Sequence, residues 1–176
     1  DNRTYARFAG MPCFEPASAQ EAKDMAKAAF ALARELKPPV LLRTTTRVSH
    51  LRGPVVFGHL PEPASIVPFE RDRKRFVSLP AVARVRHRVL AANLEKAREI
   101  AEKSPYNTMS GAGEIGIVAS GISRAFLHDV LSAHGWENKV RVFDLGMTWP
   151  LPEKSLELFM RQVKTLLVLE EGEPLI

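Results

Sequence analysis

Residues 114–146 read EIGIVASGISRAFLHDVLSAHGWENKVRVFDLG, and residues 147–169 continue MTWPLPEKSLELFMRQVKTLLVL. Three short apolar runs, at 115–119, 140–145 and 166–169, alternate with two segments in which apolar residues recur at helical intervals. Glycines and prolines stand at the joints between them. Short apolar strands that alternate with amphipathic helices indicate a parallel sheet with helices packed on it. The fold class predicted from this stretch is therefore α/β.

The first fifty residues indicate the end of a second α/β layer. Ser18 and Glu21 have the spacing of a capping box, which predicts a helix that runs to about Leu36. Apolar runs at 11–14 and 40–42 predict a strand on each side of that helix. Two strands and one long helix are too little to form an independent core.

The middle of the chain changes character. Four prolines between residues 51 and 68, at 54, 61, 63 and 68, predict an extended linker in which only residues 55–57 could pair along a sheet edge. A helix is expected from about Pro80 to about Lys103, followed by a connector at 105–113 rich in Ser, Asn and Gly. From Arg71 to Lys103 there are ten Lys or Arg against four Asp or Glu, which accounts for the whole net charge of +5.

Composition narrows the class of protein. Of the 176 residues 45% are hydrophobic and 26% are charged, which is typical of a soluble globular protein. No run is long enough to span a membrane, and no secretory leader stands at the start. The single cysteine, Cys13, excludes an intramolecular disulfide and an all-cysteine cluster held by this chain alone. We therefore expect an intracellular, cytoplasmic location.

Glycine motifs suggest one turn with binding potential. Gly111, Gly113 and Gly116 match G-x-G-x-x-G but precede a predicted strand, whereas a dinucleotide site needs them to follow one and open a helix. They predict a flexible entry to the strand. Gly121 is better placed, at the strand-to-helix turn between Ser120 and Ser123. Its amides could bind an anion or face an interface, and the alternative is a tight turn with Ser123 as the helix cap.

A second candidate site follows the predicted strand 40–42. Ligands in open α/β sheets gather at the carboxyl ends of strands. Arg43 and Arg47, with Ser49, His50 and neighbouring threonines, could hold a carboxylate or a phosphate there. The alternative is a polar loop facing solvent or an interface. No Cys/His/Asp cluster has metal-site spacing, and no hydrolase nucleophile turn is present. The sequence offers no complete active site.

The basic stretch between Arg71 and Arg88 has two interpretations. A cluster of cations could be the footprint of a nucleic acid. Phe76 is the one aromatic residue interleaved with them, so no stacking platform is evident. A solvated helix face or a contact with an acidic partner is the interpretation that we favour.

Three motifs together resemble a known family: DNR at 1–3, LRTTTRVSH at 42–50 and GMTWPLP at 146–152. The chain resembles an internal fragment of the large (alpha) subunit of indolepyruvate ferredoxin oxidoreductase, a thiamine-diphosphate-dependent 2-oxoacid oxidoreductase, over nearly its whole length. The resemblance implies a subunit of an enzyme that converts arylpyruvates and coenzyme A to acyl-CoA and carbon dioxide, with ferredoxin as electron acceptor. Another 2-oxoacid, pyruvate or a branched-chain acid, is the alternative substrate, and a non-catalytic α/β scaffold or nucleic-acid-binding module is the alternative class.

The resemblance also implies an organisation. Residues 1–50 correspond to the C-terminal part of a pyrimidine-binding domain, 51–111 to a proline-rich linker and basic helix, and 112–176 to a three-layer, parallel-sheet transketolase C-terminal-like domain. Thiamine diphosphate, magnesium and 4Fe-4S clusters are implied for the complete enzyme, together with a beta subunit. We expect this fragment alone to bind no cofactor and no metal and to be inactive. We also expect it to self-associate or to be marginally stable. Arg47, Ser49 and His50 match a segment near the active-site region, which implies an indirect, positioning role, and Arg43 or Arg47 would suit neutralisation of the substrate carboxylate.

Overall fold

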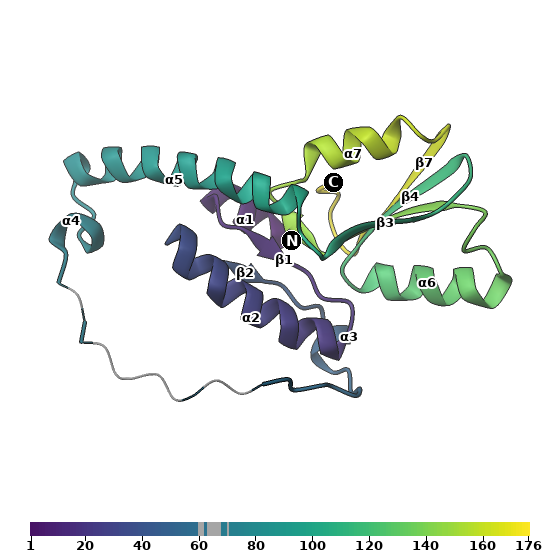
Figure 1. The fold of residues 1–176 in the computed structure, drawn as a ribbon. Coiled ribbons are helices and arrows are strands. Elements are labelled where there is room, and N and C mark those ends of the chain that lie inside the picture. The colour runs from purple at the N-terminus through teal and green to yellow at the C-terminus, as the bar shows by residue number, and fades with distance from the viewer. Residues whose placement is uncertain (60–61, 63–67, 70) are drawn as a thin grey trace.

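A computed structural model describes residues 1–59, 62, 68–69 and 71–176 of the chain, which form two small sheets and the helices that cover them (Figure 1). In this part of the chain the helices are α1 (Arg3–Ala9), α2 (Ala19–Leu36), α3 (Thr46–Ser49), α4 (Arg73–Phe76), α5 (Pro80–Glu102), α6 (Ile122–His134) and α7 (Glu153–Met160). The strands are β1 (Cys13–Phe14), β2 (Leu41–Leu42), β3 (Asn107–Gly111), β4 (Ile115–Ser120), β5 (Arg141–Leu145), β6 (Met147–Trp149) and β7 (Thr165–Leu169).

The four-stranded sheet has the order β3-β5-β4-β7, with β4 parallel to both β5 and β7. Helix α6 covers one face, where Leu127 and Leu131 pack on Ile117 and Val142. Helix α7 covers the other face, where Phe159 joins the core of that side. The three layers and the predicted parallel sheet are confirmed. The predicted connector at 105–113 is wrong, because residues 107–111 form β3, an exposed antiparallel edge strand on β5.

The three-stranded sheet has the order β2-β1-β6 and draws its third strand from the C-terminal half of the chain. Strand β1 is parallel to β2 and antiparallel to β6, which lies outside the three apolar runs from which strands were predicted in this half of the chain. Helices α2 and α5 cover this sheet, and Phe14, Met25, Ala97 and Met147 share one core. The N-terminal layer therefore obtains from β6 and α5 the apolar surface that its own two strands lack.

Local signals in the sequence explain several helix ends. The hydroxyl of Ser18 accepts a hydrogen bond from the Glu21 amide at 3.1 Å, as the capping box predicts. Helix α2 ends at Leu36, helix α1 ends before Gly10, and helix α6 ends before Gly135. Both glycines have the left-handed backbone of a helix C-terminus, at φ +63° in each case.

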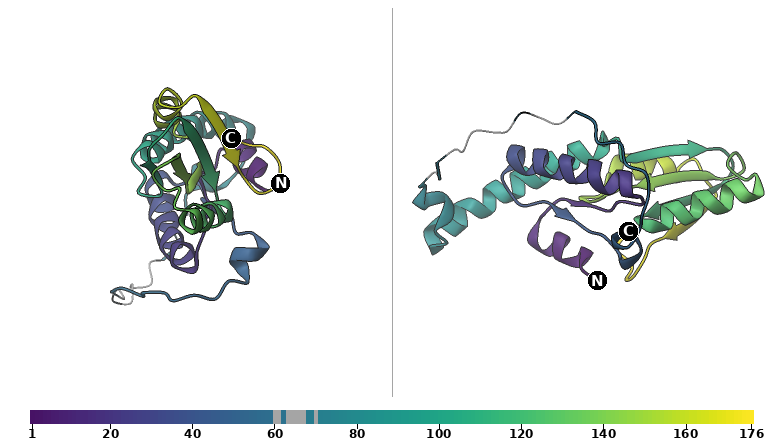
Figure 2. Two further views of the ribbon diagram at one scale, coloured as in Figure 1. Left: turned by 90° about the vertical axis from the view of Figure 1, so that its right-hand side faces the viewer. Right: turned by 90° about the horizontal axis from the view of Figure 1, so that it is seen from below.

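The predicted linker contacts α2 through Val56. Residues 55–57 do not form an edge strand: the Val56 amide donates to the Gln20 side chain at 2.7 Å, and the Val56 carbonyl accepts from Lys23 at 2.5 Å. The predicted linker prolines Pro61 and Pro63 lie outside the described residues. The views in Figure 2 place α1 beside the segment that follows β7. Among the helices described, none combines the length and apolar character needed to cross a membrane.

Candidate functional site

The carboxyl ends of strands from both sheets meet at one junction. Glu15 follows β1, Arg43 follows β2, Ser120 ends β4, and Glu170 follows β7. The Glu15 amide donates to the carbonyl oxygen of Gly146 at 2.8 Å, which ties the end of β1 to the end of β5. Because ligands in open α/β sheets bind at this edge, the junction is the first place to look for a site.

The carboxylate of Glu15 fills the turn between β4 and α6. The residue is 2% exposed, and Arg43 Nη1 donates to its Oε2 at 2.8 Å. A Cβ atom on Gly121 would stand 3.0 Å from the same oxygen. The N-terminus of a helix favours a negative charge, and here the protein supplies that charge from its own N-terminal layer.

Two arginines surround this carboxylate. Arg3, 1% exposed, donates to Asp1 at 2.6 Å and to Glu170 at 2.7 Å, and its Nε lies 4.0 Å from Glu15 Oε1. Arg43 uses all three guanidinium nitrogens, on Asn2, on Glu15 and on the carbonyl of residue 171. We call Asp1, Arg3, Glu15, Arg43 and Glu170 the junction cluster. Its two positive and three negative side chains fasten the N-terminal layer to the end of β7.

An ion pair between Arg124 on α6 and Glu21 on α2 also stabilises the junction. Arg124, 5% exposed, donates through Nη2 to the Glu15 carbonyl at 3.0 Å and through Nη1 to Glu21 Oε1 at 3.1 Å. The Nη2 group also pairs with Glu21 Oε2, which accepts from the Ala17 amide at 2.8 Å. Glu21 therefore serves the helix cap of α2 and the contact with α6 at once. Sequence reasoning found the cap but missed this contact.

The predicted site residues separate into two groups. Arg43 and Gly121 come together at Glu15, and the buried Ser120 hydroxyl stands beside them without a hydrogen-bond partner in the described residues. Ser123 is half-buried on α6, where Gly121 and not Ser123 is the N-cap residue. Residues Arg47, Ser49 and His50 lie instead on or directly after α3, and all three are exposed.

Helix α3 contacts α6. The Arg47 guanidinium lies 5.3 Å from the ring centroid of Phe126, which is the distance of a cation–π contact. Ser49 shares a hydrogen bond of 2.8 Å with the Thr44 hydroxyl. Unlike Arg43, whose nitrogens are all engaged, Arg47 keeps an exposed side chain at the rim of the junction.

A cavity of about 280 Å³ adjoins Arg124 and Glu21. His128 Nε2 and Asp144 Oδ2 lie 2.8 Å apart on its wall. Burial, together with the negative charges of Asp24 and Glu21, raises the pKa of the Tyr106 phenol above its ordinary value, so this group stays protonated. The cavity wall thus combines a neutral phenol with the Arg124–Glu21 ion pair.

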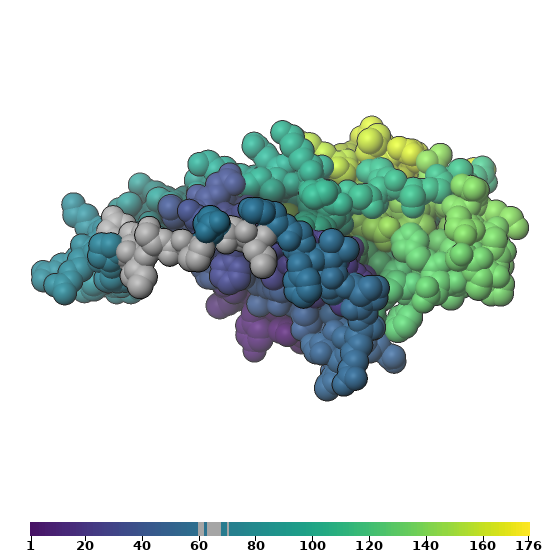
Figure 3. All heavy atoms as spheres, turned by 60° about the horizontal axis from the view of Figure 1, so that its bottom comes forward, coloured from purple at the N-terminus to yellow at the C-terminus, as the bar shows by residue number. Residues whose placement is uncertain are grey.

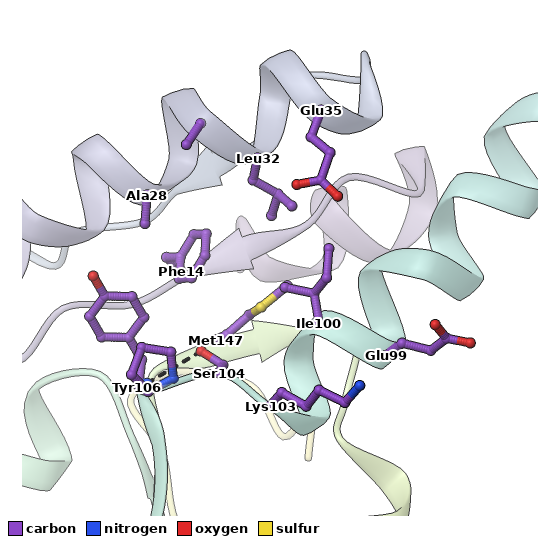
Figure 4. Close-up of a pocket in the computed structure, with 12 residues that line it drawn as sticks. Phe14, Ala28, Leu32, Glu35, Glu99, Ile100, Lys103, Ser104, Tyr106 and Met147 are labelled. Carbon is purple, nitrogen blue, oxygen red and sulfur yellow. Dashed lines mark hydrogen bonds between the residues drawn. The ribbon is translucent and has the colours of Figure 1, made fainter.

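A larger cavity of about 460 Å³ lies between α2 and α5 (Figure 4). Figure 4 shows Phe14, Leu32, Ile100 and Met147 lining its interior, with charged side chains such as Lys103 toward its rim. Sequence analysis did not single out this cavity, because its walls are ordinary apolar faces of two helices that are distant in the sequence.

The junction does not fit a magnesium diphosphate. Within the described ranges no three His, Cys, Asp or Glu side chains form a group that could hold a metal ion. At the Gly121 turn the Glu15 carboxylate already takes the place of an anion, and a second anion beside it would be repelled. The chemistry that these residues support is the fixed positioning of two layers.

Comparison with known proteins gives full-length matches of the chain. It is 40% identical over 183 aligned residues to indolepyruvate oxidoreductase subunit IorA of Pyrococcus abyssi and of Thermococcus kodakarensis, and 42% identical over 178 residues to that of Methanothermobacter thermautotrophicus. These alignments cover 99–100% of the chain but 28% of each relative. The chain therefore spans about a quarter of the length of the curated relatives that it matches. The resemblance found from the motifs is confirmed.

No family model matches the chain. A solved 2-oxoglutarate:ferredoxin oxidoreductase from Magnetococcus marinus aligns with 52% of this chain and 16% of its own, at 21% identity and a TM-score of 0.38. That likeness is too small to support a conclusion.

Proposed function

Because the chain is homologous over its full length to a segment of the IorA subunits of indolepyruvate oxidoreductase, we propose that it is part of an enzyme that oxidatively decarboxylates arylpyruvates such as indolepyruvate. The carbon–carbon bond to the carboxylate breaks, carbon dioxide leaves, and the remaining acyl group is transferred to coenzyme A. The electron pair left behind passes to ferredoxin, and the thiol proton of coenzyme A is released. Full-length identity of about 40% is the observation that carries this proposal.

We assign a structural role to this segment. In the proposed division, residues 1–50 are the end of the pyrimidine-binding domain, 51–111 a linker and basic helix, and 112–176 the transketolase C-terminal-like domain. The junction cluster supports a fixed placement of the first against the last. Arg47, Ser49 and His50, exposed on and after α3, have an indirect, positioning role in the proposed enzyme. The full engagement of Arg43 supports Arg47 as the arginine closer to a substrate carboxylate.

Cofactors and partners belong to the complete enzyme in this proposal. Thiamine diphosphate with magnesium would supply the stabilisation of the electron pair released by decarboxylation, and 4Fe-4S clusters would carry it to ferredoxin. A beta subunit would complete the assembly, in the cytoplasm. The described residues, with Glu15 in the turn of α6, support a cofactor site elsewhere in the subunit.

The proposal is tested by anaerobic reduction of a viologen dye with the complete enzyme that contains this segment. The assay includes thiamine diphosphate, magnesium and coenzyme A, and it compares indolepyruvate, phenylpyruvate and pyruvate. We expect reduction with the two aryl acids. Reduction with pyruvate alone would replace the arylpyruvates by a non-aromatic 2-oxoacid as the substrate. No reduction with any acid, in an assembly with intact clusters, would leave a non-catalytic α/β scaffold.

A further inference from the structure

The N-terminal half of α5 and the preceding α4, residues 73–89, form an arm that projects from the body of the molecule (Figures 1 and 3). We call this segment the basic arm. Its side chains are almost all exposed, in contrast to the second half of α5, where Ala97 and Ala101 are fully buried against the N-terminal layer. The two halves of one helix therefore have different surroundings.

The basic arm carries an apolar stripe that the described chain covers only in part, where α4 packs on the start of α5. Val82, Val85 and Val89 recur at helical spacing, and Val85 is 60% and Val89 39% exposed. At the base of the stripe Phe76 is 51% and Leu79 58% exposed. A short helix exposed on every side is marginal in water, and most helical stability in proteins comes from packing of an apolar face. The stripe is thus the face that a partner would cover.

Cations surround the arm: Arg86 and Arg88 flank the valine stripe on its two sides, and Arg84 lies nearer the opposite face of α5. Arg73 and Lys74 lie on α4. In the part of the chain that the structure describes, Arg84, Arg86 and Arg88 take part in no ion pair, whereas Arg98 on the buried half pairs with Glu95 and Glu153. Uncompensated positive charge selects an acidic surface, and two arms of identical chains would repel one another.

From this juxtaposition we propose that the basic arm docks into an acidic groove with an apolar floor on a second polypeptide, the partner subunit of the oxidoreductase. The valine stripe enters the floor in the manner of a helix in a groove, Arg86 and Arg88 contact carboxylates at the rim, and Arg84 adds to the positive charge of the arm. The choice of partner rests on the proposed function, whereas the chemistry of the groove rests on the arm alone. A nucleic acid would meet the cations but leave the stripe uncovered.

The test measures the dissociation constant of the complete subunit from its partner subunit, with two variants of the arm. The first is Arg84→Glu/Arg86→Glu/Arg88→Glu, and the second is Val85→Ser/Val89→Ser. The control reverses three exposed cations away from the arm, Lys27→Glu/Arg34→Glu/Lys139→Glu. The three arm cations are separate from the junction cluster, so the unfolding midpoint of each arm variant should match that of the control.

We expect each arm variant to weaken association at least about tenfold, the control to change it little, and wild-type association to weaken as salt screens the arm. Unchanged association of both arm variants would overturn the proposal. So would a lowered unfolding midpoint with association intact, which would place the arm against the rest of its own subunit. A loss confined to binding of generic RNA or DNA, or to self-association, would also overturn it. Dye reduction by the wild-type enzyme tests the proposed function separately.

Discussion

Replacement of Glu15 by alanine should be the most damaging single change at the junction. The side chain is 2% exposed, accepts from Arg43 at 2.8 Å and faces Arg3 at 4.0 Å. Its loss would leave two guanidinium groups, 1% and 10% exposed, with one carboxylate fewer. Breaking a buried pair by removal of one partner costs about 3–5 kcal/mol. Because both arginines keep other acceptors, we expect the lower end, about 3 kcal/mol.

The assay is urea unfolding of the chain at neutral pH, followed by circular dichroism. For a domain of this size the loss corresponds to a fall of about 6–12 °C in the melting temperature. Glu137→Ala, at an exposed position, is the control and should stay within about 0.5 kcal/mol of wild type. In the double variant Glu15→Ala/Arg43→Ala, the two losses should fall short of additivity by about 1–3 kcal/mol. A loss below about 1 kcal/mol for Glu15→Ala, or strict additivity, would refute the junction as the fastening between the layers.

Three further changes test the packing around the junction. Gly146→Ala should destabilise the chain by about 1–3 kcal/mol, measured by the same unfolding, because the new Cβ would stand 2.8 Å from the Tyr106 carbonyl oxygen and 2.8 Å from Met25 Cε; full stability would contradict this. Asn107→Ala should cost about 1–3 kcal/mol per buried group left unsatisfied, since its side chain accepts from the amides of Gly146 and Met147 and donates to the Ala101 carbonyl, and Asn107→Asp should recover only the accepting half. Burial raises the pKa of Cys13 from 9.0 to about 12, so above pH 9 the unfolded chain releases a thiol proton that the folded chain retains. The thiol should therefore lower stability by about 1.4 kcal/mol per pH unit between these two values, a contribution that Cys13→Ala should remove while that of Tyr106 remains.

The strongly periodic elements could be predicted because local chemistry decides them. Strand β4 and helix α6 follow from an apolar run, a glycine turn and helical spacing that ends at Gly135. Strands β3 and β6 were not predicted from the sequence, for two different reasons. The first is polar and exposed and is a strand only through its pairing with β5, and the second is three residues long beside prolines. The Asn107 side chain links β3 to the start of β6, and no local sequence pattern predicts such a contact.

Only some residues of the junction could be predicted from the sequence. Position at the carboxyl end of a strand pointed to Arg43 and to the Gly121 turn, and these two do converge. The residue on which they converge, Glu15, is an acidic residue that directly follows a buried strand, a signal that could have been used. Arg124 carries no such signal, because its partner Glu21 is 103 residues away in the sequence and only the tertiary fold brings the start of α6 to the start of α2.

The proposed function, a segment of an aryl-2-oxoacid oxidoreductase, is tested most directly by identifying the product. The complete enzyme is incubated anaerobically with indolepyruvate, coenzyme A and oxidised ferredoxin, and the products are followed by mass spectrometry together with the reduction of ferredoxin. The account predicts an acyl-CoA one carbon shorter than the substrate, formed only when coenzyme A is present and in step with ferredoxin reduction. Release of the aldehyde without ferredoxin reduction, or turnover of non-aromatic 2-oxoacids alone, would contradict it.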